Sequence, residues 1–124
     1  MNLLHNLHRV SQTADDLYAK RAPADITLRQ AVVLQCLKAN PNVSQTFLVE
    51  QTGIDRATLA SMVDRLIGKG WTVRHRTKED ARRYAVKLTV QGDKMLSQAQ
   101  AAAEEAEKAL LVAIPSVRHL MNGK

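Results

Sequence analysis

The sequence predicts a mainly α-helical protein with one small two-stranded antiparallel sheet. Apolar residues recur three and four positions apart at both ends of the chain, which is the spacing of an amphipathic helix. Two short helix-like segments lie on either side of Gly53 with only a few residues between them. Directly after them, residues 71–76 and 84–89 alternate with a period of two, as β-strands do. A helix-turn-helix followed by a hairpin is a winged helix-turn-helix.

Composition indicates a small basic globular protein. Its 124 residues suffice for one domain, and its formal net charge is +6. Ten lysines and arginines but only five acids lie between Ile54 and Lys94, so most of the excess charge is concentrated there. This favours a polyanionic partner. Aromatic residues make up 3%, too few for the stacking platforms of RNA and single-strand binders, which favours duplex DNA.

The N-terminal segments predict two different helices. A helical seam of heptad type runs along the first: Leu3, Leu7, Val10, Ala14 and Leu17. The pattern breaks near Pro23. Thr27 followed by Gln30 is a capping signal for a second helix over Leu28 to about Ala39. That helix is apolar on nearly every side, so it is expected to lie in the core.

Two shorter helices follow. Ser44 can cap a helix of about two turns, with Phe47 and Leu48 inward, that ends before Gly53. A second helix, Asp55–Ile67, is capped by its own first residue. Its inward side carries Leu59, Met62, Val63, Leu66 and Ile67.

The alternating residues predict a hairpin. Trp71, Val73 and His75 are expected to face inward on the first strand, which gives His75 a structural role. The polar segment 77–81 joins this strand to the one at 84–89.

A long helix is predicted from about Gln91 to Ala113, with Thr89 as its cap. Its seam is rich in alanine, which lets another helix come close: Leu96, Ala99, Ala103, Ala106, Leu110 and Ala113. The residues after Pro115 are expected to form one short terminal helix.

These segments resemble the MarR family of bacterial transcription regulators from about Thr27 to Ile114. The run VSQTFLVEQTGIDRATLASMVDRLIGKGW matches the family in composition and spacing. The hairpin matches more specifically, with Gly70, Asp80-x-Arg82, Leu88-Thr89 and Gly92 each at the family's offset.

The resemblance implies one domain, 1–124, with two parts. Residues 27–89 would form the winged-helix lobe that binds DNA. Residues 1–21 and 91–124 would form dimerisation helices that interlock between two subunits, although both ends are short beside typical members. The implied partners are a second copy of the chain and a double-stranded, pseudo-palindromic operator.

The helix at Asp55–Ile67 is expected to enter the major groove. Small side chains on its outward face allow close approach to base edges, and Arg56 can bond O6 and N7 of a guanine. By resemblance, Arg82 would enter the minor groove with Asp80 orienting it. The predicted DNA-binding residues are Ser44, Gln45, Arg56, Ala57, Thr58, Ala60, Ser61, Arg65, Arg74, Arg76, Lys78, Asp80, Arg82 and Arg83.

Two features of this surface bear on whether it contacts DNA. Basic residues on a hairpin are often only a solvated surface, and it is the family spacing that favours DNA contact over this alternative. Asp64 lies on the outward side of its helix and would repel phosphate unless it pairs with Arg65 or with an arginine of the hairpin.

The resemblance also implies a small aromatic or phenolic effector, bound between the dimer helices and the DNA-binding lobe. The candidate lining residues are Tyr18, Arg21, Val32, Cys36 and Trp71. For each of them, a role in the core or an interface is at least as good an interpretation. Cys36, among apolar neighbours, is expected to be a buried thiol with a raised pKa rather than a redox sensor.

Other chemistry finds little support in the sequence. His5 and His8 share a helix face and could meet His119, but no cysteine or acid completes a metal site, so no metal is predicted. No nucleophile–base pair or phosphate-binding glycine loop can be identified, which predicts a protein that is not an enzyme and needs no cofactor.

The sequence therefore predicts a sequence-specific DNA-binding regulator of transcription, a homodimeric repressor released by a small effector. Two alternatives remain: an architectural or plasmid-partition DNA binder without an effector, and a winged-helix module that binds proteins. A cytoplasmic location is expected, because the chain has one cysteine, a polar N-terminal segment and no apolar run long enough to span a bilayer.

Overall fold

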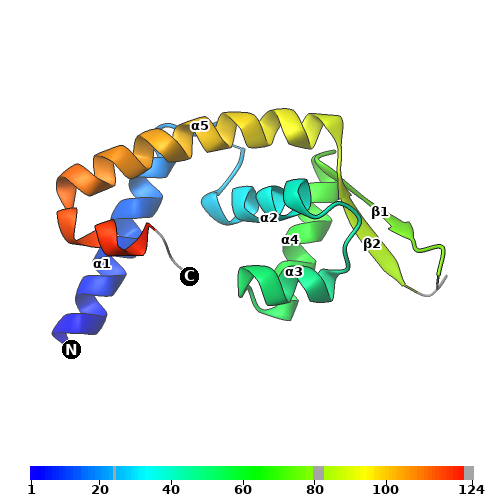
Figure 1. Cartoon of the computed structure of the whole chain (residues 1–124), viewed down its shortest axis with the longest axis horizontal. Coiled ribbons are helices and arrows are strands. Elements are labelled where there is room, and N and C mark those ends of the chain that lie inside the picture. Colours follow the sequence, from blue (N-terminus) through cyan, green and yellow to red (C-terminus); the bar gives the residue numbers. More distant parts are fainter. Residues whose placement is uncertain (24, 80–82, 122–124) are drawn as a thin grey trace. The chain divides into compact units, whose positions relative to one another are not determined.

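The computed structural model describes residues 1–23, 25–79 and 83–121. The elements are α1 (Asn2–Ala19), α2 (Leu28–Ala39), α3 (Gln45–Thr52), α4 (Arg56–Gly68), β1 (Thr72–Arg76), β2 (Tyr84–Leu88), α5 (Val90–Ala113) and the 3₁₀ helix η1 (Pro115–Leu120) (Figure 1). The predicted mainly α fold with a two-stranded antiparallel wing is confirmed. The chain divides into a first unit, Met1–Leu28 with Gln98–Lys124, and a second unit, Arg29–Ser97.

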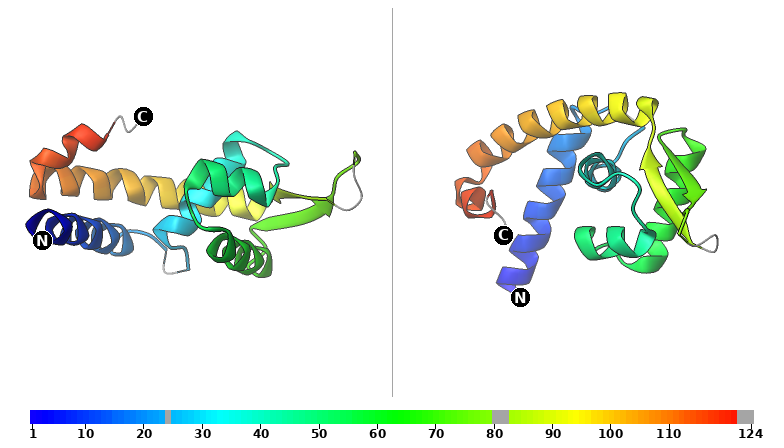
Figure 2. Two further views of the ribbon diagram at one scale, coloured as in Figure 1. Left: turned by 90° about the horizontal axis from the view of Figure 1, so that it is seen from below. Right: turned by 45° about the vertical axis from the view of Figure 1, so that its right-hand side comes forward.

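The first unit contains α1, most of α5 and η1. The C-terminal end of α1 lies near α5, its N-terminal end diverges, and the chain turns back into η1 after α5 (Figures 1 and 2). Tyr18 is 3% exposed, and its hydroxyl donates to the Ile26 carbonyl (3.2 Å). By contrast, Leu3, Leu4 and Leu7 are 71%, 65% and 55% exposed. The predicted α1 seam is therefore uncovered at its N-terminal end.

The second unit packs three helices and a hairpin around one core. Its fully buried apolar residues are Val33, Leu34, Leu37, Leu48, Leu59, Val63, Leu66, Val86 and Leu96, the last from the start of α5. Val43, in the connection before α3, pairs with Val86 through two backbone hydrogen bonds (3.3 and 2.7 Å). This bridge secures β2 to the helices.

The exposure of side chains on α2 contradicts one prediction. The helix spans Leu28–Ala39 as predicted, but it is not apolar and buried on every side. Val32 is 39% exposed, and Cys36, expected to be buried, is only partly so. The reason is that the core covers one face of α2, the face with Val33, Leu34 and Leu37.

The hairpin pairs Thr72 with Leu88 through to Arg76 with Tyr84. The predicted inward facing of Val73 and His75 is wrong: Val73 is 45% exposed and His75 is exposed as well. Trp71 and Thr72 are both buried, after which every residue of β1 is exposed. On β2, however, Ala85 and Val86 are buried, and Val86 pairs with Arg74, which contacts α3 and α4. The helices therefore cover the face of the hairpin that carries Thr72, Arg74 and Val86, and the end of the hairpin extends beyond them (Figure 1).

At the base of the hairpin, hydrogen bonds and close backbone contacts require the glycines and the threonine found there. Thr89 Oγ1 donates to the Gly70 carbonyl (2.7 Å) and accepts from the Gly92 amide (3.0 Å), while the Thr89 amide donates to the Trp71 carbonyl (3.0 Å). A Cβ on Gly92 would clash with that carbonyl. Gly70 has φ +78°, which favours glycine. These residues join β1, β2 and α5.

Candidate DNA-binding interface

The first helix of the helix-turn-helix begins at a side-chain cap, as predicted. Ser44 is extended (φ −74°, ψ 161°) and its hydroxyl accepts from the Phe47 amide (3.0 Å). Gln45 and Thr46 follow in the first turn, with Thr46 exposed. A helix start with backbone amides and hydroxyls is suited to bind a phosphate oxygen.

The turn between α3 and α4 depends on backbone conformation. Gly53 ends α3 with φ +72°, and its amide donates to the Val49 carbonyl (3.0 Å). A Cβ there would meet nothing within 4 Å, so the positive φ rather than space requires glycine. Thr52 Oγ1 donates to Leu48 (2.6 Å) and accepts from the amide of the buried Ile54 (3.2 Å). The turn therefore holds α4 at one angle to α3.

Asp55 caps α4, as predicted. Its carboxylate accepts from the Thr58 amide (2.9 Å) and the Thr58 hydroxyl (2.7 Å). These two hydrogen bonds, the one from the hydroxyl first, hold the pKa of the Asp55 carboxyl below its usual value. The hydroxyl proton of Thr58, a residue predicted to contact phosphate, is therefore directed to Asp55.

The two sides of α4 differ sharply. Leu59, Val63 and Leu66 are completely buried. On the other side Ala57 and Ser61 are exposed, and Ala60 is half-buried. A small exposed face on a well-anchored helix can approach base edges closely.

Arg56 is at the start of this exposed face. Its Nη1 donates to Thr46 Oγ1 of α3 (3.2 Å). The contact was not predicted, because Thr46 lies ten positions away and only the angle between α3 and α4 brings them together. Arg65 is exposed in the last turn of α4.

Asp64 pairs with a hairpin arginine, which is one of the two partners that the sequence allowed. Arg74 Nη2 lies 3.0 Å from Asp64 Oδ1 and 2.9 Å from Gln45 Oε1. The carboxylate is thus neutralised by β1 rather than by Arg65.

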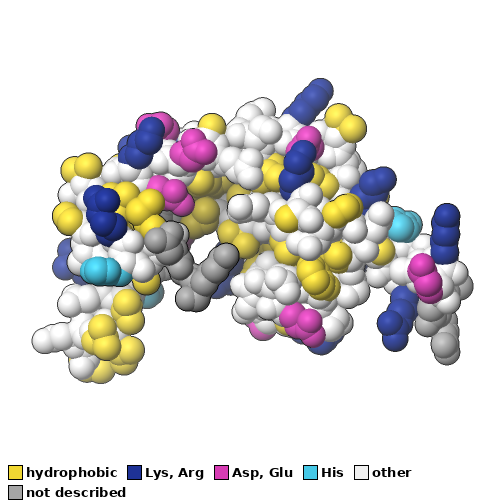
Figure 3. Space-filling view, in the orientation of Figure 1, with side chains coloured by type: hydrophobic (Ala, Val, Ile, Leu, Met, Phe, Trp, Pro, Cys, Tyr) yellow, Lys and Arg dark blue, Asp and Glu magenta, His cyan; other side chains and the backbone are white. Residues whose placement is uncertain are grey.

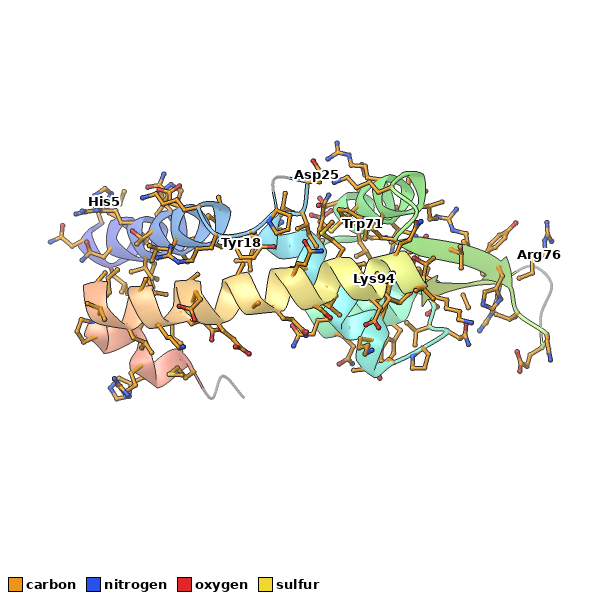
Figure 4. The ribbon with its side chains drawn as sticks, turned by 90° about the horizontal axis from the view of Figure 1, so that it is seen from above. His5, Tyr18, Asp25, Trp71, Arg76 and Lys94 are labelled. Carbon is orange, nitrogen blue, oxygen red and sulfur yellow. The ribbon has the colours of Figure 1, made fainter. Side chains whose placement is uncertain are left out.

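The hairpin carries exposed cations, and Figure 3 shows Lys and Arg side chains gathered around it. Arg76, Lys78 and Arg83 are exposed, and Arg76 lies at the far end of β1, away from the helices (Figure 4). Asp80 and Arg82, the most specific members of the prediction, lie outside the described residues.

Tyr84 is a residue of this surface that the sequence prediction missed. It is 45% exposed, and the guanidinium carbons of Arg74 and Arg76 lie 5.9 and 5.4 Å from its ring centre. The signal was available, because an aromatic residue opposite arginine in a predicted strand pair indicates a cation–π contact.

His75 joins the hairpin to the connection before α3. Its Nε2 lies 2.8 Å from Asn42 Oδ1, and its Nδ1 lies 3.2 Å from the Arg76 carbonyl oxygen. Asn42 has φ +62°. The structural role expected for His75 therefore rests on an exposed polar contact rather than on burial.

The comparison with known proteins matches the part of the chain that contains the helix-turn-helix and the hairpin. The model of the MarR family matches residues 26–84. The transcriptional regulator HosA of Escherichia coli is 32% identical over 95 residues, which are 77% of this chain and 70% of HosA. The chain belongs to the MarR family.

Solved MarR-family structures share the whole fold. Mutant MarR from Escherichia coli, complexed with operator DNA, has a TM-score of 0.86 at 26% identity, covering 98% of this chain and 92% of its own. PcaV from Streptomyces coelicolor, in complex with its natural ligand, has a TM-score of 0.83 at 25% identity, covering 96% and 91%. This MarR-family chain is a DNA-binding transcriptional regulator and not an enzyme.

The residues predicted to line an effector site belong to different units. In the first unit, Tyr18 is buried, which raises the pKa of its hydroxyl, and exposed Arg21 donates to the Leu17 carbonyl (2.8 Å). In the second unit, Trp71 is 7% exposed with Lys69 Nζ 4.6 Å from its ring centre.

Val32 and Cys36, also in the second unit, are partly exposed on α2. Partial burial raises the pKa of the Cys36 thiol, and a hydrogen bond with Asn40 opposes the shift. The raised pKa agrees with the prediction of an unreactive thiol.

Metal binding and membrane insertion find no support in the described residues. Across residues 1–23, 25–79 and 83–121, no cluster of three or more His, Cys, Asp or Glu side chains could hold a metal ion. Within the same ranges, no helix has the length and apolar character needed to cross a membrane.

Proposed function

We propose that this MarR-family chain is a homodimeric, cytoplasmic repressor that binds a pseudo-palindromic operator and is released by a small aromatic or phenolic effector. The observation that carries the DNA-binding part is the exposed face of α4 beside a cationic hairpin. Leu59, Val63 and Leu66 hold that helix from behind, while Ala57 and Ser61 are open to a groove.

The predicted DNA-binding residues form the proposed interface, either by contacting DNA or by holding the residues that do. Arg56 would read a base from the start of α4, and its bond to Thr46 limits how far it can move before binding. The hairpin cations, with Arg82 in the minor groove, would supply the charge that neutralises phosphates.

Dimerisation is supported by the uncovered end of α1. Three leucines there are more than half exposed: Leu3, Leu4 and Leu7. Exposed apolar residues gathered at one end of a helix favour contact with another protein surface. We propose that residues 1–21 and 91–124 form the dimer interface within a single domain, 1–124.

Effector release is supported by PcaV, whose structure contains its natural ligand. The candidate contacts in this chain remain Tyr18, Arg21, Val32, Cys36 and Trp71. A ligand that binds the free form better than the operator-bound form would release the DNA by that difference in affinity.

The experiment is selection of genomic fragments by the purified protein, followed by binding to one selected 30-base-pair duplex and one scrambled duplex. We expect preference for the selected duplex, two chains per duplex and release by one member of a panel of aromatic acids. Roughly 8–10 phosphate contacts per dimer give a slope of log affinity against log salt near −7 to −9. Equal affinity for both duplexes would contradict a sequence-specific operator. Failure of every ligand would favour an effector-free DNA binder.

Arg82→Ala should reduce affinity for the selected duplex by at least about tenfold while leaving the thermal midpoint unchanged, because a minor-groove arginine acts on DNA rather than on folding. Arg29→Ala is the matched control. It also removes one exposed arginine, which lies in the first turn of α2. Unchanged binding by Arg82→Ala at moderate salt would contradict a role for the wing.

A further inference from the structure

Arg74 connects three elements of the second unit through one nitrogen atom. It lies on β1, and its Nη2 donates to Gln45 Oε1 of α3 (2.9 Å) and to Asp64 Oδ1 of α4 (3.0 Å). The Tyr84 ring on β2 lies 5.9 Å from its guanidinium carbon. We call Arg74, Gln45 and Asp64 the Arg74 clamp.

The position of Asp64 makes this arrangement informative. Its side chain is 69% exposed, on the outward side of a helix whose face is proposed to approach DNA. A carboxylate there should repel phosphate. The Arg74 side chain is less exposed, at 32%, and its Nη2 group donates back to the helices. The arginine is therefore turned towards its own protein and neutralises the acid.

We propose that Arg74 is a positioning residue for DNA binding, and that Asp64 strengthens DNA binding despite its negative charge. On β1 every residue after Thr72 is exposed, so besides the burial of Val86 on β2 the angle between this strand and α4 depends on polar contacts of this kind. The helix and the hairpin must meet one duplex at two places at once. Fixing the angle between them before binding reduces the entropy lost on binding.

This proposal rests on the proposed binding of α4 and the hairpin to the same duplex. It gives Asp64 a sign, and Arg74 a salt dependence, that simple electrostatics does not. If Asp64 only repelled phosphate, its neutralisation would tighten binding. If Arg74 bound a phosphate itself, its removal would lower the salt slope by about 0.9 for each phosphate that is no longer neutralised, or about two for a dimer.

The experiment compares Asp64→Asn, Arg74→Gln and the double variant with the wild-type protein on the selected and scrambled duplexes, over a salt series. We expect each single variant to weaken binding to the selected duplex by about threefold to tenfold. The double variant should lose no more than about the larger single loss, because both substitutions break one network. The salt slope of Arg74→Gln should equal that of wild type. The thermal midpoints should agree within about 2 °C, since exposed ion pairs contribute little to stability.

Glu50→Gln is the matched control for charge. It removes one exposed acid from α3 and should bind as wild type does or slightly tighter. The clamp is overturned if Asp64→Asn binds as tightly as wild type or tighter, or if the Arg74→Gln slope falls by about two. If the wild-type protein binds neither duplex, the proposed function and the clamp are both overturned.

Discussion

The helix-turn-helix, residues 44–68, and the hairpin, residues 72–88, adjoin in the sequence but are stabilised differently. Leu48, Leu59 and Leu66 are completely buried within the helix-turn-helix. The hairpin buries only Thr72 on β1 and Ala85 and Val86 on β2, while Val73 and Tyr84 are each 45% exposed. The helices should therefore behave as a rigid body, whereas the direction of the hairpin depends on a few contacts.

The largest expected effect comes from comparing one apolar residue of the helix-turn-helix with one of the hairpin. Leu59→Ala should lower the free energy of unfolding by about 2–5 kcal/mol, because it leaves a cavity in a filled core. Val73→Ala should change it by no more than about 0.5 kcal/mol, as at most surface positions. Urea denaturation of both variants measures the contrast. Equal losses would mean that the hairpin is packed as the helices are.

The next test concerns the base of the hairpin. Gly92→Ala should lower the free energy of unfolding by about 3 kcal/mol, because the new methyl group meets the backbone carbonyl of Trp71, which cannot rotate away.

Gly68→Ala is its control, since Gly68 is also helical and a Cβ there meets nothing within 4 Å. This variant should gain about 0.4–1 kcal/mol through a less flexible unfolded chain. The same urea series measures both glycine variants. Similar stability for the two would show that the hairpin base can move to accommodate a side chain.

The features that could be predicted from the sequence are those set by neighbouring residues rather than by packing between elements. The bounds of α2 and α3, the caps Ser44, Asp55 and Thr89 and the existence of the hairpin are consequences of neighbouring residues. The facing of Val73 depends instead on which face of the hairpin packs against the helices, and the alternation of side chains alone does not decide between the two faces.

The candidate DNA-binding interface also has features that the local sequence predicts and features that depend on how the elements pack. The small exposed face of α4 was predictable from helical periodicity alone. Whether Asp64 paired with Arg65 or with a hairpin arginine depended on the approach of β1 to α4, which local spacing cannot determine. The bond from Arg56 to Thr46 required the angle between two helices.

The smallest expected effect concerns the cap of α4 and depends on pH. The pKa of Asp55 is lowered in the folded protein, so its stabilising contribution is present above the unfolded value of about 3.9 and is lost as the pH falls through the folded value. Asn also caps helices well but does not titrate in this range. Asp55→Asn should therefore match wild type near neutral pH and lose less stability on acidification.

The measurement is the difference in thermal midpoint between wild type and Asp55→Asn from about pH 6 to pH 3, in which the contributions of the other acids cancel. Thr58→Val removes the hydroxyl that is the main cause of the shift, so its own loss on acidification should be smaller than that of wild type. A difference that does not vary with pH would mean that the Thr58 hydrogen bonds do not favour the charged carboxylate. In that case the start of α4 would owe its position to Leu59 and the core beneath it, and even the polar end of this helix would be fixed by burial, unlike the hairpin.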